Sequence, residues 1–259
     1  MLVPFTWKPV EPSQRRHDLE HFQLRFLTYN IHGCRGTDGR CDASRIAEVI
    51  AQCDPDVIAL QELDVGRARS GGVDQAHEIA RHLDMKFHFH AAMRVEEEHY
   101  GNAVLTSRDM RVVKSGILPA PGEPRGALHV EISGDAGPVH VMTTHLGVMR
   151  GQRNHQLDRL LSANWIAGVP EDMPLVLMGD LNAIPFSSVY RRLSREMKDA
   201  THYRGRRGAT FPSRFPMLRI DHIFMRGPVS SRGSEVYDSA LTRLASDHRP
   251  LYADLEFKS

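Results

Sequence analysis

The chain has 259 residues, 41% of them hydrophobic and 25% charged, which suits one large or two small globular domains. Its 33 basic and 32 acidic residues leave a net charge of +1, so overall charge indicates neither a nucleic-acid-binding nor a membrane-binding protein. Three cysteines without a CxxC pair argue against a disulfide scaffold or a structural zinc site. No apolar run approaches the ~20 residues of a membrane-spanning helix, and no signal peptide is recognisable, so we expect a cytoplasmic protein.

The pattern along the chain predicts a layered α/β (α+β) sandwich. Residues 1–23 contain three prolines and little periodicity, which indicates an N-terminal arm, and residues 24–259 are expected to form a single domain. Apolar runs bounded by turn residues predict the strands, and helical spacing of apolar residues predicts the helices. The expected strands are 24–31, 56–60, 86–91, 102–106, 111–118, 126–132, 138–144, 175–178, 220–225 and 250–257. The expected helices are 42–52, with Asp42 as N-cap, 74–84, 152–167 and 186–195.

Polar side chains follow the ends of several buried strands. The residues concerned are Asn30 and His32, Gln61 and Glu62, His145, Asp180 and Asn182, Asp221, and Asp247 and His248. Ligands of α/β proteins bind where strand ends bring such side chains together. Any one of these residues could be only a turn former or a helix cap. Their recurrence favours a functional site over six independent turns.

Oxygen-bearing side chains at these positions suit a hard divalent cation. Glu62 and Asp247 are suitable carboxylate ligands, with Asn30 nearby. This set favours Mg²⁺ or Mn²⁺ over Zn²⁺. A phosphate ester requires charge neutralisation, an aligned water and help for the leaving group, which these residues could supply. The spacing alone does not fix the reaction.

The ordered motifs resemble those of the endonuclease/exonuclease/phosphatase superfamily, which includes deoxyribonuclease I, exonuclease III and the neutral sphingomyelinases. The motifs are Thr28-Tyr-Asn30-Ile-His32, Gln61-Glu62, Thr144-His145, Gly179-Asp180-Leu-Asn182, Arg219-Ile-Asp221-His222 and Ser246-Asp247-His248-Arg-Pro-Leu251. They span residues 24–257 in the family's order. The resemblance implies a four-layer sandwich of two packed mixed sheets flanked by helices, as in deoxyribonuclease I, and hydrolysis of a phosphodiester or phosphomonoester with Mg²⁺ or Mn²⁺.

The resemblance also assigns a role to each motif residue. Glu62 would be the main metal ligand, with Asn30 and Asp247 beside the metal, directly or through water. Asp180 would orient or deprotonate the attacking water, and Asn182 would hold the phosphate or that water. His248, oriented by Asp221, would contact a phosphate oxygen. His145 would stabilise developing charge or assist the leaving group.

Three further residues are candidates for substrate binding. His32 occupies a position where some relatives carry Asp or Asn, so it could face the phosphate or be a turn histidine. Asn102 resembles the family's Gly-Asn segment, although it could be a turn amide. Arg125 resembles an arginine of short bacterial members and suits phosphate, but could equally be a solvated surface residue.

The segment 200–220 contains five arginines and no acidic residue, which would suit an anionic substrate near Asp221. Three functions remain open: a phosphodiesterase acting on nucleic acid, a phosphoesterase acting on a phospholipid, inositol phosphate or small phosphorylated molecule, and a catalytically silent binding protein of the same fold. No tryptophan-bearing recognition loop supports the first function. No apolar hairpin or amphipathic insertion helix is apparent that would support membrane lipid hydrolysis. No obligate protein partner is inferred.

Overall fold

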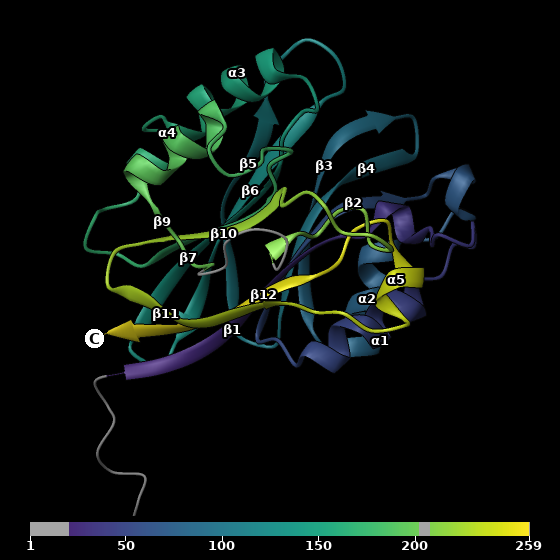
Figure 1. Cartoon of the computed structure of the whole chain (residues 1–259), viewed down its shortest axis with the longest axis horizontal. Coiled ribbons are helices and arrows are strands. Elements are labelled where there is room, and N and C mark those ends of the chain that lie inside the picture. The colour runs from purple at the N-terminus through teal and green to yellow at the C-terminus, as the bar shows by residue number, and fades with distance from the viewer. Residues whose placement is uncertain (1–20, 202–207, 259) are drawn as a thin grey trace, which may run out of the picture.

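A computed structural model describes residues 21–201 and 208–258, and these residues form two six-stranded sheets, whose arrangement is drawn in Figure 1. The first sheet has the order β11-β12-β1-β2-β4-β3 and the second the order β5-β6-β7-β8-β10-β9. The strands of the first sheet are β1 (His21–Asn30), β2 (Val57–Val65), β3 (Lys86–Val95), β4 (Glu98–Thr106), β11 (Val229–Val236) and β12 (Leu251–Lys258). Those of the second are β5 (Met110–Leu118), β6 (Arg125–Gly134), β7 (Gly137–His145), β8 (Leu175–Asp180), β9 (Lys198–Asp199) and β10 (Asp221–Arg226).

Each sheet contains one parallel pair at its centre, which requires a crossover connection. Strands β1 and β2 are parallel and are joined through α1 (Ala43–Cys53), whereas β7 and β8 are parallel and are joined through α3 (Arg150–Leu161). The remaining helices are α2 (Gln75–Leu83), α4 (Ser188–Glu196), the short α5 (Thr242–Ala245), and the 3-10 turns η2 (His32–Cys34), η3 (Ala68–Ser70) and η4 (Ile166–Gly168). Helices α1 and α2 lie beside one sheet, and α3 and α4 beside the other (Figure 1).

Three hydrophobic clusters separate these layers, because alternate side chains of a strand point to opposite faces. Phe26 of β1 lies in the cluster between the sheets, together with Val130 and Val176 of the second sheet. Its neighbour Leu27 lies in the cluster that packs under α1 and α2. A third cluster, which includes Leu157 of α3, lies outside the second sheet. The expected four-layer sandwich of two mixed sheets flanked by helices is therefore confirmed.

The helix boundaries follow from side-chain caps. Asp42 accepts a hydrogen bond from the backbone N–H of Arg45 and begins α1, as the sequence predicts, and Asp74 caps α2 through His77. The expected helix 152–167 is too long, because α3 ends at Leu161 and the chain then turns through η4.

Several strands also differ from expectation. Strand β2 continues to Val65, so Glu62 lies within the strand and not after its end, and the hairpin of β3 and β4 is longer than expected, because β3 ends at Val95 and β4 begins at Glu98. Strand β1 begins at His21, so residues 21–23 pair with β12 instead of belonging to the expected arm, of which residues 1–20 lie outside the described residues. Strand β11 was not expected, because its sequence is polar and it lies at a sheet edge. No helix of the described residues is long and apolar enough to cross a membrane.

Candidate active site

Strand register brings the polar motif residues together at one edge of both sheets. In the first sheet, Asn30 at the end of β1 is paired with Gln61 of β2. In the second, His145 at the end of β7 is paired with Asp180 of β8, and Asp180 is paired with Asp221 of β10. The two sheets face each other, so residues more than a hundred positions apart in sequence become neighbours.

Glu62 lies in a β-bulge of β2. The pairing with β4 shifts between Leu60 and Leu63, and Glu62 adopts a left-handed backbone conformation with φ of 62°. Such a conformation is uncommon for a residue with a Cβ atom and recurs at functional sites. The bulge inserts an extra residue and redirects the side chain of Glu62.

Gly179 allows β8 to approach β7 closely. Its φ is 153°, and a Cβ atom there would lie 1.9 Å from the carbonyl oxygen of Thr144. Only glycine therefore permits the pairing that brings Asp180 beside His145.

A network of hydrogen bonds connects the carboxylates of the two sheets. The amide nitrogen of Asn30 donates to Glu62 Oε1 at 2.9 Å and to Asp180 Oδ2 at 3.1 Å. The backbone N–H of Asn182, a residue that also has positive φ, donates to Asp180 Oδ1 at 2.8 Å. Burial, followed by the charge of Asp221, raises the pKa of Asp180 to about 7. The Asp180 carboxyl group can therefore exchange a proton near neutral pH.

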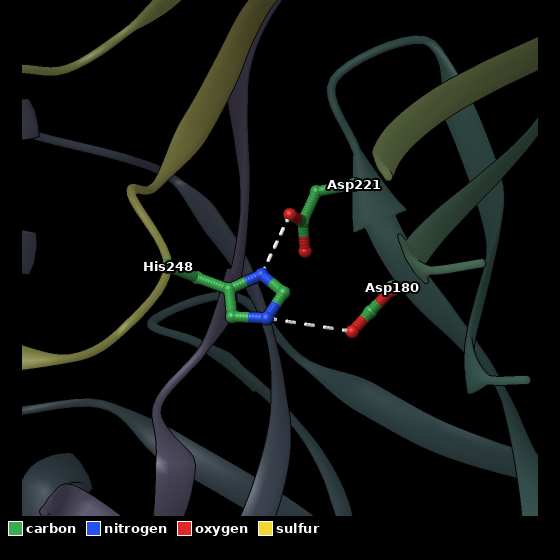
Figure 2. Close-up of side chains that lie close together, drawn as sticks. All are labelled: Asp180, Asp221 and His248. Carbon is green, nitrogen blue, oxygen red and sulfur yellow. Dashed lines mark hydrogen bonds and ion pairs between the residues drawn. The ribbon is translucent and has the colours of Figure 1, made fainter. Parts of the chain in front are cut away.

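His248 is paired with Asp221 and faces Asp180 (Figure 2). Its Nδ1 lies 2.8 Å from Asp221 Oδ2, and its Nε2 lies 3.7 Å from Asp180 Oδ2. Burial would lower the pKa of His248, but the carboxylates of Asp221 and Asp180 outweigh burial and raise that pKa to about 10. The imidazole is therefore protonated at neutral pH, and Nε2 can donate a hydrogen bond.

His145 has the opposite electrostatic environment. Burial, the guanidinium of Arg125 and the positive charge of His248 lower its pKa well below 6.5, so the ring is neutral. Arg125 Nη1 lies 3.0 Å from His145 Nδ1, and a guanidinium can only donate, so Nδ1 accepts and the ring proton is on Nε2. Nε2 lies 3.5 Å from Asp180 Oδ2, which can accept this proton, and 3.1 Å from Asn182 Nδ2, which donates to the carbonyl of Leu146.

The environment of Glu62 fits a divalent cation. Its side chain is 22% exposed, and its closest basic group among the described residues is the neutral ring of His145, whose Nδ1 lies 3.9 Å from Oε1. Asp180 shares the Asn30 amide with it. A partly buried carboxylate without a positive partner is costly unless a cation neutralises it, and carboxylate and amide oxygens suit Mg²⁺.

Asp180, Asp221 and His248 also form a compact group, with one potential ligand atom from each residue within 4.8 Å of the others. This group is less suited to a metal ion, because His248 Nδ1 and Asp221 Oδ2 already bind each other. The arrangement fits proton handling better than metal ligation.

The remaining candidates lie around this centre. Asp247 and His32 are partly exposed, with 3.7 Å between Asp247 Oδ1 and His32 Nδ1, and the backbone N–H of His32 donates to Asn30 Oδ1. Asn102 is buried and donates to the carbonyl of Gly126 in the other sheet.

Arg125 is buried as well, and most of its donors have protein partners. Besides His145, it contacts the hydroxyl of Tyr100 at 3.3 Å and the carboxylate of Glu123 at 2.9 Å. The structure thus supplies contacts that position His145, where the sequence suggested only a phosphate ligand or a surface arginine.

Two residues that sequence reasoning missed support the site. Thr210 donates its hydroxyl proton to Asp221 Oδ2 at 2.5 Å. Ser246 donates to the backbone carbonyl of Asn30 at 2.8 Å and thereby ties the His248 loop to β1. Ser246 lies directly before Asp247 in a motif already identified, so the sequence could have indicated that it supports the site. No sequence motif indicates such a role for Thr210.

The expected basic segment 200–220 is only partly available for an anion. Arg219 is buried and pairs with Asp199, so it is not free to bind substrate. Arg214 is exposed and contacts the hydroxyl of Thr37. Residues 202–207, which include Arg204, Arg206 and Arg207, lie outside the described residues.

Comparison with known proteins agrees with this fold. The curated protein YbhP of Escherichia coli strain K12, whose function is uncharacterised, is 28% identical over 252 residues, covering 91% of this chain and 97% of its own. The crystal structure of an endonuclease/exonuclease/phosphatase from Beutenbergia cavernae has a TM-score of 0.74 at 24% identity, covering 92% of this chain and 72% of its own. The structure of D. rerio TDP2 with a single-strand DNA product has a TM-score of 0.67 at 19% identity, covering 90% and 98%.

The family assignment rests on the sequence profile together with this fold. The profile of the Endonuclease/Exonuclease/phosphatase family matches residues 27–248, which include every motif residue from Asn30 to His248. The chain therefore belongs to the Endonuclease/Exonuclease/phosphatase family.

Proposed function

We propose that this protein is a phosphoesterase that requires Mg²⁺ or Mn²⁺ and hydrolyses a phosphate ester with water. One observation carries the proposal. The buried carboxyl group of Asp180, with a pKa near neutrality, lies between a protonated His248 and a neutral His145 and shares an amide donor with Glu62. This arrangement combines a general base, two hydrogen-bond donors and an unneutralised carboxylate in one place.

Glu62 would hold the cation, with Asp247 and Asn30 as its neighbours. As oriented, Asn30 presents its nitrogen to Glu62, so it would bind the cation only after its amide turns, and otherwise orients the Glu62 carboxylate. When bound, the cation supplies Lewis-acid polarisation of the phosphoryl group and neutralises its developing charge.

Asp180 would act as the general base. Its carboxylate accepts a proton from water while the water oxygen forms a bond to phosphorus and the bond from phosphorus to the leaving oxygen breaks. The backbone N–H of Asn182 and the amide of Asn30 fix the orientation of this carboxylate. Asn182 also reaches His145 and the carbonyl of Leu146, so its amide is positioned next to the same phosphoryl group.

The two histidines would bind phosphoryl oxygens in different protonation states. His248, kept protonated by Asp221, donates from Nε2 and carries a positive charge toward the oxygens. His145, kept neutral by burial and by Arg125, donates from Nε2 without adding charge. Preorganised donors of this kind stabilise charge that develops in the transition state.

The first test is hydrolysis of bis-(p-nitrophenyl) phosphate with Mg²⁺ or Mn²⁺, compared with an EDTA control. We expect metal-dependent turnover in the wild type and a loss of about 100-fold or more in Asp180→Asn and Glu62→Gln. Glu131→Gln is a matched control, because this partly exposed carboxylate of β6 pairs with Arg111, away from the site. Turnover that persists in EDTA, or that survives Asp180→Asn, would contradict the proposal.

A further inference from the structure

The most exposed hydrophobic side chains of the described residues are concentrated at the site. Five large hydrophobic residues are between 62% and 82% exposed, and every other one is at most 57% exposed. These five are Val148, Met149, Phe186, Phe215 and Met217. Val148 and Met149 follow His145, Phe186 follows Asn182, and Phe215 and Met217 precede Asp221. We refer to the segments 146–149, 181–187 and 208–220 as the rim loops.

The topology places all three rim loops at the same edge of the second sheet. Strands β7 and β8 are parallel, so the loops that follow His145 and Asp180 leave the sheet on the same side. Strand β10 is antiparallel to β8, with Asp221 opposite Asp180, so the loop that precedes Asp221 also lies on that side. The rim loops therefore surround the catalytic groups of the second sheet.

The outward position of Phe186 is held by the backbone. Phe186 has a φ of 73°, a left-handed conformation that is unfavourable for a bulky side chain, and is 82% exposed. The turn is closed by a backbone hydrogen bond from Ser187 to Ile184, another exposed apolar residue. A strained turn that exposes an aromatic ring to water does not stabilise the folded state, and its presence points to a binding role.

The rim loops carry positive charge and no negative charge. Their sequences contain no Asp or Glu, whereas Arg214 lies within them and Arg150 follows directly after Met149. Arg153 donates to the backbone carbonyl of Gly147. Arg153 is half-buried, and its guanidinium is occupied by this carbonyl and that of Val148. Arg150 and Arg214 are exposed and, among the described residues, form no ion pair with a carboxylate, so their charges are available to an anionic surface.

The chemistry of the exposed side chains favours lipid over nucleic acid. Three of the five residues are aliphatic or thioether side chains, which offer no flat face for base stacking but insert readily among acyl chains. Apolar side chains that project beside arginines match the two layers of an anionic membrane, the acyl boundary and the charged headgroups.

We propose that the rim loops dock onto an anionic phospholipid surface and that the phosphate ester cleaved by this site is part of a lipid headgroup. The choice of substrate rests on the phosphoesterase function proposed above, whereas docking does not. The apolar side chains enter the acyl boundary, the arginines bind headgroup phosphates, and the reacting groups lie at headgroup depth.

Docking is tested by sedimentation of the full chain with vesicles in EDTA, so that binding is scored without chemistry. The vesicles are phosphatidylcholine alone, or phosphatidylcholine with phosphatidylglycerol, phosphatidic acid and cardiolipin. The rim variant combines Met149→Ser, Phe186→Ser and Phe215→Ser. The matched control combines Val95→Ser, Val113→Ser and Ile117→Ser, which are exposed hydrophobic residues of β3 and β5. Thermal unfolding verifies that both variants are folded.

We expect the wild type and the matched control to bind the anionic vesicles alike, and the rim variant to bind them at least about tenfold more weakly, equivalent to about 1.4 kcal/mol. High salt should weaken binding, and vesicles of phosphatidylcholine alone should bind less. Absence of binding to anionic vesicles, equal binding by the rim variant, or tighter binding to single-stranded oligonucleotide than to vesicles would overturn the docking proposal.

Hydrolysis separates the two proposals. With Mg²⁺ present, the wild type should release a phosphorylated or headgroup product from the anionic vesicles. Cleavage of the soluble diester without any cleavage of vesicle lipid would overturn the lipid substrate. Vesicle binding without turnover of any ester would instead overturn the phosphoesterase function and leave docking intact.

Discussion

Replacing Asp221 with Asn should remove the charge of His248, with a cost in stability that depends on pH. The carboxylates around His248 raise its pKa from 6.5 to about 10. A pKa change of one corresponds to about 1.4 kcal/mol of free energy between the two protonation states. The native state of the wild type therefore gains on the order of 5 kcal/mol from protonated His248. The folded pKa lies above the unfolded one, so this stability is fully present below about pH 6.5 and is lost as pH rises through about 10.

At pH 7 we expect Asp221→Asn to be less stable than the wild type by about 4 kcal/mol, which lowers Tm by roughly 10 °C for a chain of this length. The difference should shrink as pH rises toward 10, because the wild type then loses the same charged pair. Circular dichroism melts across this range measure it. Turnover of the diester at pH 7 should fall by about 100-fold, because neutral His248 no longer donates as a cation.

Asp254→Asn provides the control for this experiment. Asp254 pairs with Arg25 at 2.7 Å between Arg25 Nε and Asp254 Oδ1, and arginine stays protonated throughout the range. Its effect on Tm should therefore not vary between neutral pH and pH 10. A stability difference for Asp221→Asn that is equally independent of pH, or a His248 ring that NMR finds neutral at pH 8 in the wild type, would refute the reasoning.

Three further predictions follow from other contacts. Gly179→Ala should destabilise the protein by several kcal/mol and lower turnover, because its Cβ would meet the carbonyl oxygen of Thr144; a Tm equal to the wild type's would contradict this. Burial lowers the pKa of both His129 and His222 to about 4. Their contribution to stability is present above pH 6.5 and should be lost as pH falls from 6.5 to about 4, and urea titrations of His129→Gln should show a smaller loss of stability in acid. Saturating Mg²⁺ should raise the Tm of the wild type but not that of Glu62→Gln, and an equal rise in both would exclude Glu62 as the ligand.

The central strands could be predicted from the sequence because their apolar runs are bounded by distinct breakers. The expected strands 138–144 and 175–178 correspond to β7 and β8, whose ends carry His145 and Asp180. The polar edge strand β11 could not be predicted, because pairing with β12 stabilises it and its own sequence shows no apolar alternation. Tertiary pairing outweighs local preference at such an edge.

The site residues could be named from their motifs, but their contacts could not. Nothing in the sequence indicates that Arg125 faces His145, since twenty residues and a hairpin separate them. Likewise, the partner of Arg219 is Asp199, which precedes the basic segment, so counting charges overstated what that segment offers to an anion. The exposed rim is also a property of the fold, because its residues are scattered among three loops that contain no long apolar run.

The two sheets form two halves of the fold, and the site is divided between them. Each sheet consists of an edge hairpin, a parallel pair joined by a helix, and a second antiparallel pair, although the sequence shows no internal repeat. The same three strand positions supply Asn30, Glu62 and Asn102 in one sheet and His145, Asp180 and Asp221 in the other. The proposed cation ligand Glu62 and the proposed proton acceptor Asp180 thus belong to opposite halves, and the sheet-to-sheet packing fixes the spacing between them. Turnover would then depend on how the two sheets pack together. A rigid shift of one sheet against the other would abolish turnover, while the three site residues of each sheet kept their positions relative to one another.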